Sequence, residues 1–456
     1  MARNNPYSRR KSMKLELYPH PPSGTKRGIH LWPVPNHPTG AALAEWVSRV
    51  RRCHFGWAVL LDGGSVGSDG RTSSQETCEA LLAEGIIPIV RLYRGEPNPG
   101  RLDEGNLAAV RALVKTGVRY FQDNCEPNLS NEWKPGEWKA GGRPERVMSD
   151  WIENAMAICR QGGIPLYPPL APCGWHKESG SIPWNTTAVA WLKKNRAADM
   201  ATLIIEGMGL ATHDYALNHW YRDEKGVWHF EYPDDPKAQA REPGVTVMNY
   251  DNGVTGWRAL DRLFFEAFGQ HVPILGTEGG IPPKGAWYQE DAGYPGYGEK
   301  EQAEGTVAMY DWIERNTPAH YFTLASWIFV NKDAGGHDPT WEEQSWYQLG
   351  KELPVVAAMH VNPTPKPEPP GAPAPLADDV ISRAIVSESW VLRGVARNQG
   401  AALYKKAQEK RLGAPMGSEM EATLKDSDHK IVWQSYAMGI VWCFEGDWGN
   451  VRVIEW

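Results

Sequence analysis

Between residues 28 and 353, short apolar runs alternate with segments whose apolar residues recur at the spacing of a helix. An apolar run of strand length followed by an amphipathic helix is typical of a βα unit, and repeated units predict a parallel sheet. The predicted strands are 28–35, 55–64, 86–98, 119–128, 164–172, 209–217, 272–280 and 320–331. A predicted helix follows each strand, the first over residues 41–52 and the last over residues 345–353.

Eight strands and eight helices in strict order predict an α/β fold, the (β/α)8 TIM barrel. The alternative is a doubly wound open sheet, which usually carries a glycine-rich phosphate turn after one strand. The stretch GYPGYGEK (293–300) follows the seventh strand, but its spacing and context do not suit such a turn. Glycine follows several predicted helices, as at Gly117, where it suits the left-handed position that ends a helix.

Composition divides the chain into four parts. Residues 1–27 are rich in Arg, Lys, Pro and Ser and predict a disordered or loosely draped tail before the barrel of residues 28–358. Residues 359–376 are rich in proline, which favours polyproline II and predicts a semi-rigid linker. Residues 377–456 predict a small α+β domain that opens with a helix and continues with two or three strands.

Charge and cysteine usage exclude several classes of protein. The net charge is −7 and no long basic run occurs, so nucleic acid is not an expected partner. No apolar segment reaches transmembrane length, and the N-terminus lacks a signal-peptide pattern, so no membrane partner is expected. The six cysteines form no CxxC pair and no metal-ligand spacing, which indicates buried free thiols and no metal site.

Tryptophan is abundant, with 22 residues. Many indoles must fill the core, because each buries a large area. Several, however, stand at predicted strand ends and in loops, where an indole face can stack on a sugar ring. The excess therefore favours a carbohydrate ligand.

Two glutamates stand where catalytic groups of a barrel are expected, at the carboxyl ends of strands. The fourth predicted strand ends in Asp123-Asn124-Cys125-Glu126-Pro127-Asn128, and the seventh in Thr277-Glu278-Gly279-Gly280. Glycoside hydrolysis needs two carboxyl groups on opposite sides of the scissile bond. Strands four and seven lie across the barrel mouth, so Glu126 and Glu278 are the predicted catalytic pair. The alternative for either glutamate alone is a structural ion pair.

These motifs resemble the clan A retaining glycoside hydrolases. The resemblance implies that Glu126 is the general acid/base and Glu278 the nucleophile, with no cofactor. It also implies that His213 and Tyr215, two apart on the sixth strand, belong to the site and that Tyr215 supports the nucleophile. Trp327 on the eighth strand matches the tryptophan that commonly floors the sugar subsite.

One departure concerns the residue before Glu126. The family motif has Asn there, which contacts the 2-hydroxyl of the sugar, whereas this chain has Cys125 and places Asn124 one residue earlier. Because side chains alternate along a strand, Asn124 is expected to share a face with Glu126 unless a bulge re-aims one of them. The group that meets the 2-position of the sugar is left open.

Further strand-end residues complete the predicted substrate-binding set. The set comprises His30, Trp32, Asp62, Arg91, Asn124, His213, Tyr215, Trp287 and Trp327. Three members have structural alternatives: His30 and His213 as satisfied core histidines, and Asp62 as the cap of a turn.

The C-terminal region has a pattern of its own. Leu412-Gly413-Ala414-Pro415 followed by residues 432–436 and 439–442 resembles one LGFP repeat of bacterial cell-wall proteins. The resemblance implies attachment to a wall or surface glycan through residues 377–456. The alternative is a packing module with Trp433, Trp442 and Trp448 in its core.

The sequence as a whole predicts a retaining glycosidase that cleaves O-glycosidic bonds of an oligosaccharide or polysaccharide. The alternatives are a non-catalytic carbohydrate-binding barrel and a lysin that cleaves cell-wall peptidoglycan. The substrate class favours an extracellular or cell-surface location.

Overall fold

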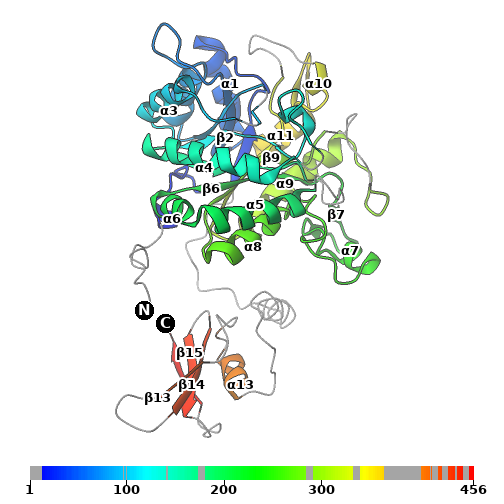
Figure 1. Ribbon diagram of the computed structural model, residues 1–456. Helices are drawn as coiled ribbons and strands as arrows, with labels where there is room; N and C mark the ends of the chain where they lie inside the picture. Colours follow the sequence, from blue (N-terminus) through cyan, green and yellow to red (C-terminus); the bar gives the residue numbers. More distant parts are fainter. Residues whose placement is uncertain are drawn as a thin grey trace. The chain divides into compact units, whose positions relative to one another are not determined.

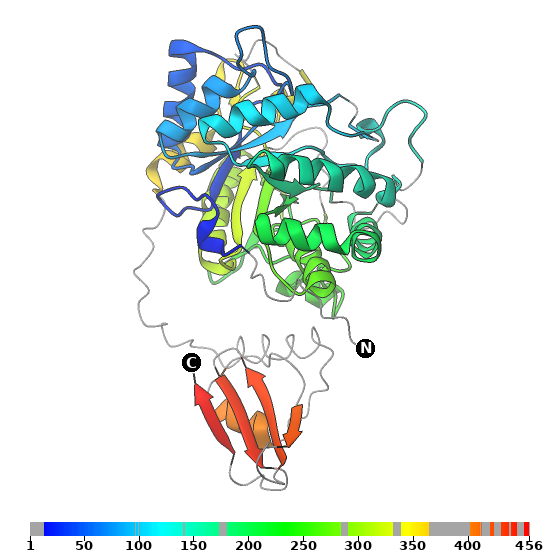
Figure 2. The same ribbon diagram turned by 60° about the vertical axis from the view of Figure 1, so that its left-hand side comes forward.

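A closed ring of parallel strands forms the centre of the computed structural model, with helices around it (Figures 1 and 2). The ring has the order β1-β10-β9-β6-β5-β4-β3-β2, and each strand runs parallel to its neighbours. Its strands are β1 (Arg27–His30), β2 (Trp57–Asp62), β3 (Ile87–Leu92), β4 (Tyr120–Gln122), β5 (Ile164–Tyr167), β6 (Gly209–Tyr215), β9 (Ile274–Gly280) and β10 (Tyr321–Ser326). The (β/α)8 barrel prediction is confirmed. The structure describes residues 13–95, 97–98, 100–139, 142–172, 180–283, 291–331, 339–363, 402–410, 412, 420–423, 430–436, 439–444 and 451–455.

The helices follow the strands as a barrel requires. They are α1 (Gly40–Arg52), α2 (Gln75–Ala83), α3 (Glu104–Thr116), α4 (Pro144–Arg160), α5 (Ser181–Asn195), α6 (Ala197–Glu206), α8 (Trp257–Phe268), α9 (Glu299–Asn316) and α11 (Pro354–Val361). Helix α3 shows why they begin and end where they do. Asp103 and Asn106 form a capping box at its start, and Gly117 ends it with a left-handed φ of 110°.

The last helix differs from the prediction. Residues 345–353 are not helical; they include the short antiparallel pair β11 (Tyr347–Gln348) and β12 (Lys351–Glu352). Helix α11 starts immediately afterwards at Pro354, because proline is tolerated in the first turn, where its missing N–H costs nothing. The linker predicted from residue 359 therefore begins too early, inside α11.

Alternating side chains separate two apolar layers. In β2, Trp57 and Val59 point into the barrel and join Tyr120, Leu166 and other inward residues in one cluster. Ala58 and Leu60 point outward and join the larger cluster between sheet and helices. The barrel interior is thus a packed core that holds the strand ends in place.

Residues 13–26 close the amino-terminal end of this barrel, so the loose tail predicted through residue 27 is wrong for them. After the 3-10 turn η2 (Leu15–Leu17), Tyr18 is buried and donates its hydroxyl to the carbonyl of Met208 at 3.2 Å. The indole of Trp57 donates to the carbonyl of Thr25 at 2.9 Å. Apolar burial outweighs the polar composition of this segment, because the open barrel end offers it apolar side chains.

The loops at the carboxyl ends of the strands carry further short elements. They are η3 (Ser130–Glu132) after β4, β7 (Tyr221–Arg222), β8 (Trp228–His229) and α7 (Pro236–Arg241) after β6, and α10 (Pro339–Glu342) after β10. Tyr221 and Tyr232 of the β6–α8 loop form a small aromatic core with Tyr294 of the β9–α9 loop.

The chain divides into two compact units, and the second spans residues 367–456. Its described elements are α13 (Ala402–Glu409) and an antiparallel sheet of β13 (Met420–Thr423), β14 (Lys430–Tyr436), β15 (Gly439–Phe444) and β16 (Arg452–Glu455). Strand β13 was not predicted. The described core is aliphatic and includes Leu403, Val432 and Val441. Trp442 is only partly buried and is not part of this described core, and the Arg452 guanidinium lies 4.9 Å from its ring centre.

Among the described residues, no helix combines the length and the apolar character that a membrane crossing requires.

Candidate active site

Glu126 reaches the barrel mouth through an unusual backbone turn after β4. Its φ is +38°, a left-handed conformation that a residue with a side chain rarely adopts, and its N–H donates to the carbonyl of Pro169 at 2.9 Å. Strain of this kind persists only where the surroundings enforce it, and it concentrates at functional sites. At this turn side chains no longer alternate between the two faces of the strand. The consecutive residues Cys125 and Glu126 therefore both contact side chains of the same site.

Glu278 is placed by the close approach of β9 to β6, where His213 is its register partner. Gly279 has a φ of 150°, and a Cβ there would lie 2.5 Å from the carbonyl oxygen of Asp214. Only glycine therefore allows the two strands to come so close. The Thr-Glu-Gly-Gly motif thus positions the glutamate through its neighbours.

One histidine contacts both glutamates. Nδ1 of His213 lies 2.7 Å from Oε1 of Glu126 and 3.7 Å from Oε2 of Glu278. Because both distances start at the same nitrogen, these two oxygens are at most 6.4 Å apart, the sum of 2.7 and 3.7 Å. An ionised Glu126 can only accept a hydrogen bond, so Nδ1 then carries the hydrogen. Burial disfavours the imidazolium, but the charge of Glu278 and the bond to Glu126 outweigh it and raise the pKa of His213.

Glu278 has a partner on each oxygen. Tyr215 donates its hydroxyl to Oε2 at 3.0 Å, and Nη1 of Arg91 lies 3.4 Å from Oε1. Burial raises the pKa of Glu278, and the charge of Glu126 acts in the same direction; His213, Arg91 and Tyr215 oppose this rise. Burial also raises the pKa of Tyr215 well above its usual range, so the phenol remains a hydrogen-bond donor.

Two groups that the prediction did not assign also belong to this site. Sγ of Cys125 lies 3.9 Å from Oε1 of Glu278, and burial raises the thiol pKa well above its usual value. Glu132 in η3 is a third carboxyl group, whose pKa is raised to about 7 by burial, with contributions from Glu126 and Glu278. Cys125 was visible as a departure from a motif; a glutamate in a loop gives no sequence signal of its own.

An aromatic wall lies beside the glutamates. Trp327 donates its indole N–H to Gln344 at 2.9 Å and meets Trp341 edge-on at 5.2 Å. The ring of His30 lies 4.5 Å from that of Trp327. His30 is fully buried, and both ring nitrogens lack a hydrogen-bond partner within the described residues. Burial, then the charges of Arg91 and His213, lower the pKa of His30, so its imidazole is neutral.

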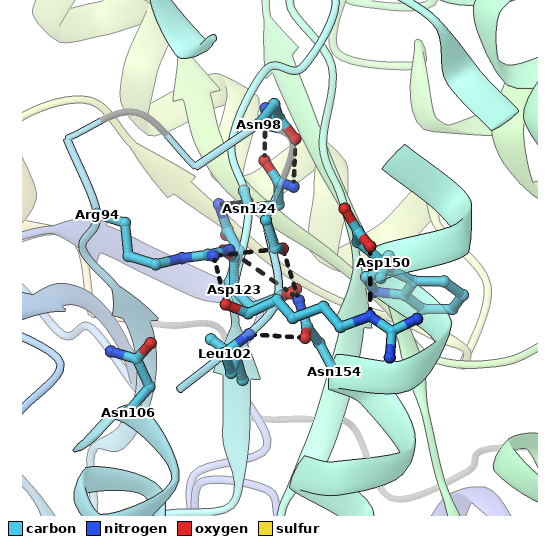
Figure 3. A network of polar contacts seen from close by, with 12 residues as sticks. Arg94, Asn98, Leu102, Asn106, Asp123, Asn124, Asp150 and Asn154 are labelled. Carbon is cyan, nitrogen blue, oxygen red and sulfur yellow. Dashed lines mark hydrogen bonds and ion pairs between the residues drawn. The ribbon is translucent and has the colours of Figure 1, made fainter. Parts of the chain in front are cut away.

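Asn124 does not share the face of Glu126 that strand alternation predicted for it, and its contact with substrate stays a prediction. Its amide pairs reciprocally with that of Asn98, at 2.8 and 3.1 Å, and its Oδ1 also accepts the N–H of Cys125 (Figure 3). Asn98 in turn donates its backbone and side-chain N–H to the carbonyl of Glu132. Asn124 therefore fixes the loop that carries the acidic groups.

Asp123 anchors the same loop from the other side. Its carboxylate accepts the amide of Asn154 at 2.7 Å, and Arg94 donates to its carbonyl at 2.7 Å (Figure 3). The left-handed turn at Glu126 is thus held by contacts to α4 and to the loop after β3.

Two other predicted binding residues are structural. Trp32 is 1% exposed and packs edge-on against His37 in the core outside the barrel. The Asp62 carboxylate accepts the N–H of Gly64, and the N–H and hydroxyl of Ser74, so it caps the turn after β2. Trp287 lies outside the described residues.

The ligand atoms of Cys125, His213 and Glu278 lie within 4.8 Å of one another, close enough to hold a metal ion. The two carboxylates, together with the hydrogen-bonded tyrosine and the arginine, can also perform acid/base and nucleophilic chemistry without a metal ion.

No protein-family model and no curated protein sequence matches this chain. Solved structures of similar shape include a monomeric β-xylosidase from Caulobacter crescentus, at 16% identity over 74% of this chain and 67% of that chain, TM-score 0.43. A GH128 endo-β-1,3-glucanase from Pseudomonas viridiflava is 14% identical over 74% and 97%, TM-score 0.43. Xylanase A from P. fluorescens subsp. cellulosa is 10% identical over 74% and 96%, TM-score 0.42. All three are glycoside hydrolases, and at such low similarity nothing about this chain's activity follows from them.

Proposed function

We propose that the barrel is a retaining glycoside hydrolase with Glu278 as nucleophile and Glu126 as general acid/base. The observation that carries the proposal is the bridge through His213, which limits the nearest separation of Glu126 Oε1 and Glu278 Oε2 to 6.4 Å. Retaining enzymes hold their carboxyl groups about 5–5.5 Å apart, whereas inverting enzymes need about 6.5–9.5 Å to admit a water.

The contacts suit the two roles. Glu278 is the more buried carboxylate and has Arg91 and Tyr215 to hold it ionised and aligned for attack. Its oxygen bonds to the anomeric carbon while the glycosidic bond breaks and Glu126 gives its proton to the leaving oxygen. Water then attacks the same carbon, passes a proton to Glu126, and releases Glu278. The Glu126 side chain is 20% exposed, which suits proton exchange with leaving group and water.

The test measures turnover and stereochemistry on a broad panel of glycans, including purified cell walls, with NMR of the first anomer released. A first product of retained configuration supports the proposal. Turnover should also be lost in Glu126→Gln and Glu278→Gln but kept in the exposed control Glu304→Gln. An inverted first product contradicts the retaining mechanism. Binding without turnover in the parent protein would instead identify a carbohydrate-binding barrel, and reducing ends released from walls would identify a lysin.

For residues 377–456 we propose attachment to a surface or wall glycan. The supporting observation is Trp442, which lies outside the aliphatic core and carries the Arg452 guanidinium over its ring. Full-length protein should sediment with insoluble glycan, and Trp442→Ala should reduce the bound fraction. An unchanged bound fraction would contradict this role for Trp442.

A further inference from the structure

A second cluster of ionisable side chains lies at the other end of the barrel from the glutamates. Asp261 projects from α8, His271 stands just before β9, and His320 directly precedes β10. Nδ1 of His271 lies 2.9 Å from Oδ1 of Asp261, and Nε2 of His320 lies 3.4 Å from Oδ2. Three separate segments therefore bring two imidazoles and a carboxylate together.

The spacing of these groups fits a metal ion. One ligand atom from each residue lies within 4.8 Å of the other two. A tetrahedral zinc ion with bonds of about 2.0–2.2 Å places its ligands roughly 3.3 Å apart. The His320–Asp261 separation already has this value, and the His271–Asp261 separation needs to open by only a few tenths of an ångström.

The rings are held in place before any ion arrives. The rings of His271 and His320 stack with their centres 4.5 Å apart and their planes 19° apart. The ring of Phe265 also stacks on His271, with the ring centres 4.5 Å apart. The side chains of Asp261 and His320 are 12% and 14% exposed, whereas that of His271 is 43% exposed. A partly open site gives an ion a route in and leaves a position for water.

A purely structural interpretation is that Asp261 bridges two histidines through hydrogen bonds. His271 fits that interpretation, because it is hydrogen-bonded to the carboxylate. His320 fits it less well, because its Nε2 lies 3.4 Å from Oδ2 of Asp261, which is longer than the 2.9 Å contact of His271. A cation between the carboxylate and the two imidazoles would make shorter contacts with all three residues than Nε2 of His320 now makes with Asp261.

We propose that Asp261, His271 and His320 form a zinc site at the amino-terminal end of the barrel, with water as the fourth ligand. Two imidazoles and a carboxylate are a ligand set that Zn²⁺ accepts. The ion ties α8 to the segments that lead into β9 and β10. Its role is structural, and the stabilisation of the folded chain grows with the logarithm of the zinc concentration once that concentration exceeds Kd.

The test uses the full chain, without a histidine tag and stripped of metal, titrated with ZnCl₂ by calorimetry and by thermal unfolding. We expect one saturable site at this cluster and an increase in Tm with zinc. His271→Ala, whose exposed side chain makes misfolding the least concern, should weaken that binding at least about tenfold and remove the increase in Tm. His320→Ala should do the same. The matched control is His229→Ala, because His229 also contacts two carboxylates, Asp223 and Glu231, but no second imidazole.

The active-site trio of Cys125, His213 and Glu278 is a possible competitor for zinc, so the titration is repeated with Cys125→Ser. Binding that persists in Cys125→Ser and is lost in His271→Ala supports the proposed site. No saturable binding overturns the proposal. Binding that is lost in Cys125→Ser and unchanged in His271→Ala also overturns it, because the ion is then in the catalytic centre. Neither result depends on whether the barrel hydrolyses glycans.

Discussion

The thiol of Cys125 lies 3.9 Å from the same Glu278 oxygen that Arg91 approaches, while Tyr215 holds the other oxygen. A thiol is a weak hydrogen-bond donor, so it adds little to the contact that Arg91 makes with this oxygen. The reactivity of Glu278 should therefore depend on what stands at position 125.

Cys125→Ser supplies a stronger donor in the same place. A hydrogen bond to the charged form favours that form, so the pKa of Glu278 should fall. The acidic limb of the kcat/KM profile should move to lower pH, with a moderate loss of rate at the optimum because the nucleophile is less basic. Cys159→Ser, at a partly exposed position on α4, is the control and should leave the profile unchanged. A limb that moves to higher pH in Cys125→Ser would contradict this interpretation.

Tyr215→Phe should have the opposite effect on the same limb. Loss of the hydroxyl removes a bond that favours ionised Glu278, so the limb should move to higher pH. A hydrogen bond to a charged group contributes about 1.5–3 kcal/mol, so kcat/KM should fall roughly 10- to 150-fold. Tyr321→Phe is a matched control, since Tyr321 donates to Asp214 outside the site. Equal losses in the two variants would show that the effect is only structural.

Asp214 should make stability fall as pH rises. Burial raises its pKa to about 7, although Thr212 and Tyr321 donate to it. An unfolded Asp has a pKa of about 3.9, so between about pH 4 and 7 only the folded state holds this proton. Stability from this group is therefore complete below about pH 4 and lost by about pH 7, at up to roughly 1.4 kcal/mol per pH unit.

Asp214→Asn should flatten that slope, which urea unfolding at pH 5 and pH 7 can measure. Glu304→Gln, on the exposed face of α9, should keep the parent slope. Parallel slopes for the parent protein and Asp214→Asn would show that Asp214 does not hold the proton.

Asn124→Ala tests whether this residue supports the loop or meets the sugar. Removal of its amide takes away the hydrogen bond that Oδ1 of the buried Asn98 accepts from Asn124, which should cost about 1–3 kcal/mol of stability in thermal or urea unfolding. Activity should fall alike on substrates with a 2-hydroxyl and a 2-acetamido group. A selective loss on one of the two would instead place Asn124 in contact with the 2-position.

The sequence by itself determined the barrel fold and the positions of Glu126 and Glu278 at the ends of its strands. Hydrophobic periodicity is a local property, and both the eight βα units and the strand ends that carry Glu126 and Glu278 follow from it. Arg91 was found in the same way, because a strand end in a barrel is a location that can be read along the chain. His213, Tyr215 and Trp327 were expected from the resemblance to the clan A glycoside hydrolases. The Gly-Gly pair after Glu278 was visible too, although not the close approach of β6 that requires it.

Only the tertiary structure decided which strand-end side chains meet at the site. The left-handed turn at Glu126 directs Cys125 rather than Asn124 to the carboxylates, and strand alternation cannot foresee it because the turn is enforced by Pro169 from the next strand's end. Trp32 and Asp62 stand at strand ends but face the outer core and a turn. Asp261 and His271 are near each other in the sequence, but His320 reaches them only because β10 pairs with β9.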